Sequence, residues 1–243
     1  MLTISITTAV FLLALGCVMS ARPSIDWIGY QWFVYNDQNI APGPNNWSSN
    51  NVWVDQDNRL HLKLSYSSTT NGWTCAELYT RKKFSFGTYR WFVEGAIDKF
   101  DPNVILGLFN YGGADYINEI DIEVAKWGAT KPNAANMGFT VYPNVFNISK
   151  PIQLVKRVPS NGTYTTHQFT WTSDKVSFLV QDGFMESPDQ NILYSYQTPN
   201  TFASAVPYTS APLYMNLWLM EGRAPINGKE MEIIIHDFKY IKA

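Results

Sequence analysis

Short runs in which apolar and polar residues alternate recur along most of this chain. In the run at residues 59–65, Leu60, Leu62 and Leu64 share one face of an extended strand, and the residues between them are polar. Similar runs lie at residues 87–95, 104–111, 118–124, 137–142, 167–171, 175–183, 213–220 and 231–240. Turn-forming residues separate these runs, and no helical period of useful length interrupts them. We therefore predict an all-β fold, a β-sandwich jelly roll of two antiparallel sheets.

Composition limits what the molecule binds. A chain of 243 residues is long enough for one large domain with a substantial core. Only 16% of the residues are charged and the net charge is -2, which argues against a nucleic-acid partner. Aromatic residues make up 15% of the chain, with nine Trp, which suits a large β core or a surface that stacks on flat apolar ligands. Because no repeat or linker interrupts residues 22–243, we predict a single domain there.

The first 21 residues have the pattern of a secretory signal peptide. A short apolar run is followed by small residues, with cleavage expected after Ser20 or Ala21. The apolar run is too short to be a membrane span. A second reading takes Cys17 as the anchored cysteine of a bacterial lipoprotein, but we place secretion first. Removal of this segment leaves Cys75 as the single cysteine, so the mature chain is expected to form no internal disulfide.

Three acidic residues, Glu119, Asp121 and Glu123, alternate with apolar residues in the segment 118–124. In a strand the three carboxylates share one face, where they repel one another unless water screens them or some are protonated. One interpretation is an ordinary solvated strand face. The other is glycoside hydrolysis, in which one acid attacks the sugar and another protonates the leaving oxygen.

Geometry adds a condition to the catalytic interpretation. Retaining glycoside hydrolysis needs two carboxyl groups about 5 to 5.5 Å apart, whereas residues four apart on a flat strand are separated by about 13 Å at the backbone. Side chains that lean together on a concave sheet close this gap. We therefore expect the acidic strand to lie on the hollow face of a curved sheet, along a substrate cleft.

The acidic segment resembles the E-x-D-x-E signature of glycoside hydrolase family 16, in the form without a bulge that lichenases and xyloglucan-active members carry. Further matches to lichenases are the C-A-E of residues 75–77, the segments FGTYRWFVEG at 86–95 and VILGLFNYGG at 104–113, and the M-N-L-W of residues 215–218. Their order and spacing agree across most of residues 45–240. The resemblance implies a curved jelly roll with the acids in its cleft, as the geometric argument requires.

The resemblance also implies catalytic roles. Glu119 matches the family's nucleophile, Glu123 its acid/base, and Asp121 the assisting carboxyl that is hydrogen-bonded to the nucleophile. These roles imply a double displacement with retention of the anomeric configuration. They fit the physics, because an anionic neighbourhood in a partly dry cleft favours a proton on Glu123.

Six further residues are candidates for contact with the sugar. Each has a structural alternative as a packing or surface residue, because most Trp side chains of a β-sandwich lie in its core. The predicted substrate-binding residues are Glu77, Phe109, Tyr111, Trp127, Tyr142 and Trp218.

Metal binding is weakly indicated. Asp237 resembles the Asp that helps to hold a structural calcium in many members of the family. The three histidines, His61, His167 and His236, have no metal-ligand spacing and are expected to lie on strand faces. No organic cofactor is implied.

Departures from the family pattern bear on specificity. Asn45 stands where lichenases carry the cysteine that pairs with the equivalent of Cys75. Tyr79 replaces an Arg and Thr140 an Asn, both at positions that the resemblance places near the substrate. The reaction class is therefore better indicated than the substrate.

Three functions remain open at this stage. The first is a secreted, endo-acting hydrolase of a polysaccharide, with β-glucan as the expected substrate and a monomer as the expected state. The second is a transglycosylase that uses the same acids. The third is a jelly-roll lectin without catalysis, although a pure binding module has no use for a proton donor paired with a nucleophile.

Overall fold

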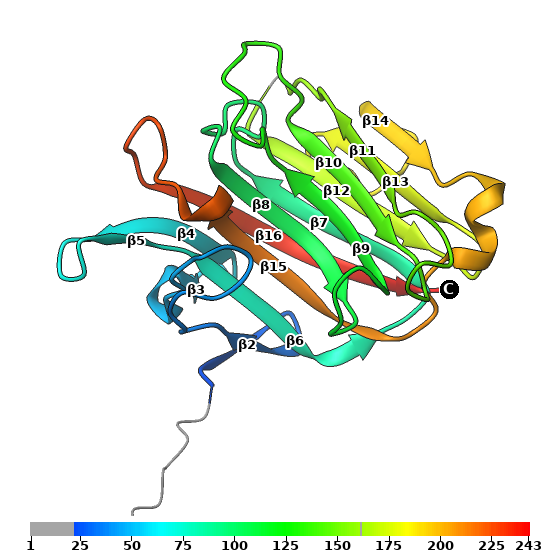
Figure 1. Cartoon of the computed structure of the whole chain (residues 1–243), viewed down its shortest axis with the longest axis horizontal. Helices are drawn as coiled ribbons and strands as arrows, with labels where there is room; N and C mark the ends of the chain where they lie inside the picture. The colour runs from blue at the N-terminus through cyan, green and yellow to red at the C-terminus, as the bar shows by residue number, and fades with distance from the viewer. Residues whose placement is uncertain (1–21, 161) are drawn as a thin grey trace, which may run out of the picture.

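Two antiparallel sheets packed face to face form the computed structural model, which describes residues 22–160 and 162–243 (Figure 1). The first sheet has the order β1 (Ser24–Trp27), β2 (Tyr30–Val34), β6 (Ala76–Phe84), β15 (Ala211–Leu219), β8 (Val104–Tyr111), β9 (Glu119–Val124), β10 (Met137–Tyr142) and β11 (Ile152–Lys156). The second has the order β14 (Ile192–Gln197), β13 (Val176–Asp182), β12 (Tyr164–Trp171), β7 (Gly87–Glu94), β16 (Met231–Lys242), β4 (Leu60–Ser67) and β3 (Val52–Val54), with β5 (Gly72–Thr74) paired to β4. Within these described ranges, three short 3-10 helices lie at Ser49–Asn51, Asn200–Ala205 and Met220–Gly222. The two-sheet, all-β prediction is confirmed.

The strands predicted from alternation are all present, two of them, β8 and β10, with the expected bounds. The alternation argument missed short or peripheral strands such as β1, β3 and β14, and it also missed β6, a nine-residue interior strand whose start was indicated only by the family resemblance. Strands at a sheet edge bury little side-chain surface, so their sequences need not alternate. The exposed face of β14 is an example, because most of its residues are exposed or half-buried.

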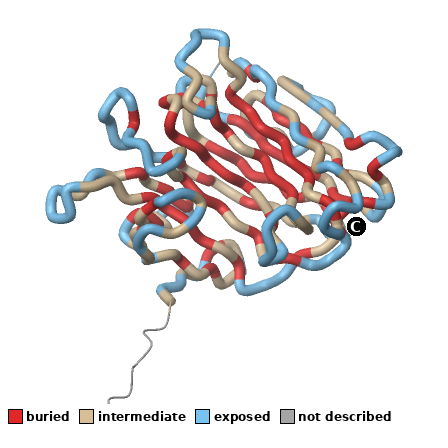
Figure 2. The backbone as a smooth tube through the Cα atoms, in the orientation of Figure 1, coloured by how far each residue is buried: buried red, intermediate tan, exposed pale blue. Residues whose placement is uncertain are grey.

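Alternate residues of each central strand fill the space between the sheets. On β9, Ile120, Ile122 and Val124 are fully buried. Figure 2 shows the buried tube running through the middle of the strands and the exposed tube in the loops around them. Full burial of one such side chain contributes about 1.5–3 kcal/mol. The apolar face of β9 therefore fixes which way its acidic face points.

Aromatic side chains dominate the core beneath the second sheet. The Tyr89 ring of β7 stacks on Phe169 of β12 with 4.4 Å between centroids. Trp91, also on β7, lies 5.1 Å from the ring of Phe238 on β16. The high aromatic content of the chain is thus used in part for packing, one of the two uses that composition allowed.

The predicted signal segment at residues 1–21, including Cys17, lies outside the described residues. Within the described ranges, 22–160 and 162–243, no helix has the length and apolar character needed to cross a membrane.

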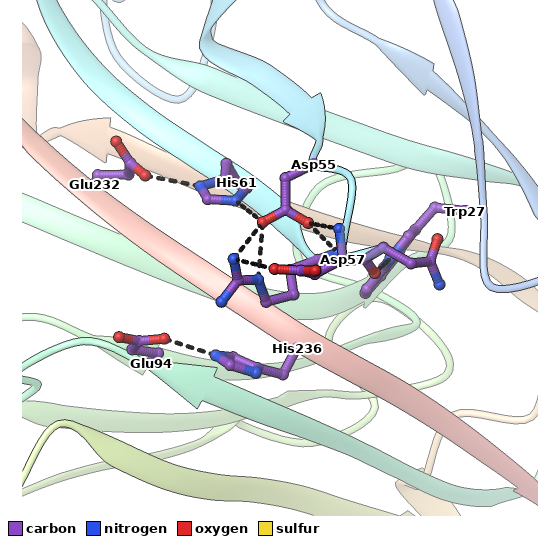
Figure 3. Close-up of polar contacts among 9 residues, drawn as sticks. Trp27, Asp55, Asp57, His61, Glu94, Glu232 and His236 are labelled. Atoms are coloured by element: carbon purple, nitrogen blue, oxygen red, sulfur yellow. Dashed lines mark hydrogen bonds and ion pairs between the residues drawn. The ribbon is translucent and has the colours of Figure 1, made fainter.

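A polar network fastens the turn between β3 and β4 to strand β16 (Figure 3). Asp55 Oδ1 accepts the backbone N–H groups of Asp57 at 3.0 Å and of Arg59 at 2.8 Å. The Arg59 guanidinium donates to Asp55 Oδ2, which also lies 3.0 Å from Nε2 of His61. The other ring nitrogen of His61, Nδ1, lies 2.7 Å from Glu232 Oε1 on β16. Asp55 is therefore the acceptor on which the turn converges.

The pKa of Asp55 reflects this convergence. Partial loss of solvation acts to raise it, but the hydrogen bonds from the Arg59 amide, His61 and the Arg59 guanidinium hold it well below its usual range. A second histidine–carboxylate pair lies nearby. His236 Nε2 is 2.6 Å from Glu94 Oε2, and this contact joins β16 to β7 (Figure 3). The three histidines lie on strands, as expected.

Replacement of Asp55 tests this network. Asp55→Ala should lower the midpoint of thermal unfolding, because two backbone N–H groups, Arg59 and His61 all lose an acceptor. Asp57→Ala is the matched control, since its side chain is 66% exposed and contacts only Arg59. Equal midpoints for the two variants, measured by circular dichroism at neutral pH, would contradict this assignment.

Candidate active site

Strand β9 presents Glu119, Asp121 and Glu123 on the face opposite its buried side chains. Asp121 is 6% exposed, and the two glutamates are half-buried. All three line a cleft of about 840 Å³ on the first sheet, whose walls come from strands β6, β15, β8, β9, β10 and β11. The acids thus lie neither on a flat outer wall nor sealed in the core, and the predicted alternation is confirmed.

The six predicted substrate-binding residues are brought to the same cleft: Glu77, Phe109, Tyr111, Trp127, Tyr142 and Trp218. Tyr142 of β10 lies directly opposite Glu119 in the strand register. Trp127 follows β9, and its ring meets Trp218 edge-on with 6.2 Å between centroids. The structure places these side chains together, and their contact with a sugar stays a prediction.

Glycines flank Glu123 on both neighbouring strands. The register pairs Glu123 with Gly107 of β8 and with Gly138 of β10. A Cβ atom at Gly138 would lie 3.5 Å from Glu123 Oε2, which is ordinary contact. A Cβ atom at Gly107 would lie only 2.4 Å from Asn216 Oδ1, which is a clash. Glycine at 107 therefore lets the Asn216 side chain lie across the cleft floor.

Asn216 is held in one orientation on that floor. Its Oδ1 accepts the backbone N–H of Gly107 at 3.1 Å, so its Nδ2 is left to donate to Glu77 Oε2 at 3.3 Å. Glu77 is 5% exposed, and burial raises its pKa to about 8, against the lowering effect of this hydrogen bond. Near neutral pH, Glu77 therefore carries a proton that it can donate to a ligand in the cleft.

Burial and mutual repulsion disfavour three negative charges on β9. Burial, together with the charges of Glu119 and Glu123, raises the pKa of Asp121 well above its usual range. Burial raises the pKa of Glu119 to about 8, and the hydrogen bond from protonated Asp121 offsets only part of this rise. Burial raises the pKa of Glu123 to about 7. The three acids therefore tend to keep their protons near neutral pH, and they lose them as a coupled set.

A loop that covers one end of the cleft is tied down by Asn45. Its Nδ2 donates to the Leu219 carbonyl at 2.9 Å and to the Pro42 carbonyl at 2.6 Å, and its Oδ1 lies 3.3 Å from Cys75 Sγ. Pro42 and its neighbour Ile40 line the cleft. Asn45 and Cys75 therefore meet where the resemblance placed a disulfide, and a polar contact joins them.

Several cleft residues were missed by the sequence analysis. Tyr214 and Asn216 share a face of β15 with Trp218, so alternation outward from Trp218 was a signal that could have found them. Tyr35 and Tyr116 also line the cleft, but each lies in a connection outside the strands. No local sequence pattern marks such positions, because tertiary structure brings them to the cleft.

The carboxylate of Asp237, the predicted calcium ligand, is in contact with two neighbouring residues of β16. Its Oδ1 accepts the backbone N–H of Phe238 at 2.8 Å, and its Oδ2 lies 3.9 Å from Lys239 Nζ. The lysine thus places a positive charge beside the carboxylate. Within residues 22–160 and 162–243, no group of three or more His, Cys, Asp or Glu side chains is arranged to hold a metal ion. The structural calcium therefore stays a prediction, and no step below depends on it.

Solved structures with the same architecture include a β-glucanase of Bacillus licheniformis, 20% identical, covering 91% of this chain and 97% of that chain with a TM-score of 0.63. The chain has the jelly-roll fold of β-glucanases. A glycoside hydrolase family 16 endo-glucanase from Bacteroides ovatus is 13% identical, with 86% and 94% of the two chains covered and a TM-score of 0.63. A protein of Mycobacterium tuberculosis described as an immunostimulatory antigen and pseudo β-1,3-glucanase is 17% identical, with 87% and 91% covered and a TM-score of 0.64. No family model and no curated protein matches the sequence.

The proton on Glu123 has a consequence for stability. The pKa of Glu123 in the folded chain lies above its ordinary value. The protonated side chain therefore makes its full contribution to the free energy of unfolding below about pH 4.5, and this contribution is lost as the pH rises through about 7. Glu123→Gln should therefore exceed the wild type in unfolding free energy at pH 8, by on the order of 1–3 kcal/mol. At pH 4 the two should be equally stable.

Urea unfolding at both pH values measures this difference. Glu221→Gln is the control, because its carboxylate is on an exposed side chain outside the cleft. A gain at pH 8 that is equally large at pH 4 would show that packing, and not ionisation, separates Glu123→Gln from the wild type.

Proposed function

We propose that the protein is a secreted, endo-acting glycoside hydrolase that cleaves β-glycosidic bonds in a polysaccharide, with retention of configuration. The observation that carries this proposal is the placement of Glu119, Asp121 and Glu123 along the floor of a cleft large enough for several sugar residues. The three acids titrate as a coupled set near neutral pH, so the loss of one proton from the set leaves an attacking carboxylate beside a proton donor.

In the proposed reaction, Glu119 attacks the anomeric carbon while Glu123 gives its proton to the departing sugar oxygen. The glycosidic bond breaks, and a covalent glycosyl ester forms on Glu119. Asp121 donates a hydrogen bond to Glu119, which favours the ionised form before attack and stabilises the carboxylate when it leaves. In the second step Glu123 takes a proton from water, and the resulting hydroxyl replaces Glu119 at the anomeric carbon.

Support for β-glucan as the substrate comes from two sources. The similar solved structures include a β-glucanase and an endo-glucanase. The part of the cleft formed by the described residues is lined by five carboxyl groups and by no Lys, Arg or His. A polymer that carries sulfate or carboxylate groups would meet no compensating charge there. We also propose that residues 1–21 direct secretion and that the chain acts as a monomer.

Transglycosylation is a second candidate. It uses the same acids, with an acceptor sugar hydroxyl in place of water in the second step. The observation that favours it is the aromatic lining of the cleft, which includes Tyr35, Tyr111, Tyr116 and Tyr142 in addition to the two Trp residues. Such surfaces bind sugar rings well and can hold an acceptor against the competition of water.

Product analysis separates these functions. The protein is incubated with a panel of β-glucans and β-galactans, and reducing ends are recorded against product size. New reducing ends with shorter products indicate hydrolysis, whereas longer products without new reducing ends indicate transfer. Binding without any product, measured by calorimetry, would refute both enzymatic proposals and leave the lectin.

Removal of Glu119 tests the nucleophile. Glu119→Ala should lower kcat/KM on β-glucan by roughly 10⁴-fold or more. With an activated aryl glycoside, added azide should restore turnover and yield a glycosyl azide of inverted configuration, because the azide takes the place of the carboxylate. Glu221→Ala is the control, and wild-type activity in Glu119→Ala would refute the assignment.

Glu123 should set the alkaline limb of the pH profile. Because its pKa is about 7, kcat/KM on β-glucan should fall as the pH rises through that value and the acid loses its proton. Glu123→Gln should lower this activity by about 10²- to 10⁴-fold. With a dinitrophenyl leaving group, which departs without protonation, the loss in forming the glycosyl ester should be much smaller. An equal loss on both substrates would exclude Glu123 as the acid.

A further inference from the structure

Four aromatic side chains lie at one register across four neighbouring strands of the first sheet. Phe33 of β2 pairs with Tyr79 of β6, Tyr79 with Tyr214 of β15, and Tyr214 with Phe109 of β8. The next residue along this line is Asp121 of β9, opposite Phe109. We call these four residues the aromatic row, and it leads directly to the catalytic acids.

Rings of the aromatic row cover one another's faces. Tyr79 and Tyr214 stack with 5.0 Å between centroids and planes 15° apart, and Tyr214 and Phe109 stack at 5.2 Å and 21°. Phe33 completes the row against Tyr79 at 5.4 Å. Because the strand neighbours occupy both faces of Tyr214, its ring cannot serve as a flat platform under a sugar. What it offers to the cleft is its edge, with the phenol hydroxyl.

That hydroxyl is free to bind a ligand. Within residues 22–160 and 162–243, neither Tyr214 nor Tyr35 makes a hydrogen bond through its phenol oxygen, although both line the cleft. Tyr111, by contrast, donates its hydroxyl to Asp115 at 2.9 Å. Tyr35 packs against Tyr79 at 5.6 Å, so the two free hydroxyls belong to one packed group. A phenol can both donate and accept, which matches the hydroxyl groups of a sugar.

At the level of the aromatic row, the opposite half of the cleft is built differently, although Tyr142 of β10 lines it further along. Across β9 from the aromatic row, the line continues through Thr140 of β10 and Gln153 of β11, which are small or flexible polar residues. Gly138 lies beside them, opposite Glu123. A rigid, stacked set of side chains is preorganised for binding, whereas flexible side chains lose freedom when a ligand binds. The two halves should therefore hold sugar residues with different strength.

We propose that the half of the cleft over β6, β15 and β8 is a subsite for uncharged β-linked sugar residues, and that the Tyr214 hydroxyl sets the preference of the protein for longer chains. This inference rests on the proposed hydrolase function. It assigns Tyr214 as a specificity-determining residue and Tyr35 as its partner, and it assigns Tyr79 a positioning role, since Tyr79 stacks on Tyr214 without lining the cleft.

Tyr214→Phe tests the subsite, because it removes one oxygen and keeps the stack. The substrates are unbranched β-gluco-oligosaccharides of increasing length, and kcat/KM is measured for each. Wild-type kcat/KM should rise with length until the subsite is filled. In Tyr214→Phe, kcat/KM for the long chains should fall by about three- to tenfold, so the ratio of long-chain to short-chain kcat/KM shrinks.

Tyr208→Phe is the matched control, since Tyr208 is 61% exposed and does not line the cleft. It should keep the wild-type ratio, and equal thermal midpoints for the two variants show that the fold is intact. A carboxymethylated β-glucan should be cleaved at least about tenfold more slowly than its neutral parent, because the subsite offers no cation to a carboxylate.

The outcomes are distinguishable. A wild-type protein that neither cleaves nor transfers any neutral β-glycan overturns the proposed function and this inference with it. An active wild type whose length dependence is unchanged in Tyr214→Phe overturns the subsite alone. An equal loss on short and long chains also overturns it, because the hydroxyl would then act on the reaction and not on chain length.

Discussion

Three carboxyl groups held side by side on β9 repel one another when ionised, and much of the cleft is arranged around that repulsion. The buried isoleucines and valine on the opposite face of the strand hold the acids in position. Since the acids cannot turn away, the cost is reduced by the protons that the three acids retain near neutral pH. Closely coupled carboxyl groups of this kind are what the proposed hydrolase reaction needs, because it requires one group to attack and another to donate a proton.

The neighbouring strands adapt to the acids. Gly107 and Gly138 flank Glu123 and leave space beside it, and the absence of a side chain at Gly107 allows Asn216 to bridge to Glu77. Two lines of residues then cross the sheet next to each other, one polar through Asn216 and one aromatic through Tyr214. The cleft floor thus combines fixed hydrogen-bonding groups with a rigid aromatic support.

Much of this site was predictable from the sequence, because alternation on a strand is a local property. The acidic strand, its buried face and eight of the nine cleft residues named in advance follow from two-residue periodicity together with the family resemblance, and Trp127 was named as an aromatic ring close to the acids. Tyr35 and Tyr116 were not predictable, since long-range packing carries them to the cleft from connections between strands. Stacking of Phe109 on Tyr214 was also invisible in the sequence, because it depends on the pairing of β8 with β15. Fold similarity does not decide the chemistry either, as similar structures include both an endo-glucanase and a protein described as a pseudo β-1,3-glucanase.

The polar contact between Asn45 and Cys75 bears on how the cleft responds to reducing and oxidising conditions. Among the described residues, Asn45 ties the Pro42 wall of the cleft to its neighbours by non-covalent contacts, with the Leu219 carbonyl at the end of β15 and with the buried thiol of Cys75, which precedes β6. A reductant therefore has no bond to break at this point, and an oxidant reaches the thiol poorly because the residue is fully buried. The position of the cleft wall at Pro42 should thus be the same under reducing and oxidising conditions.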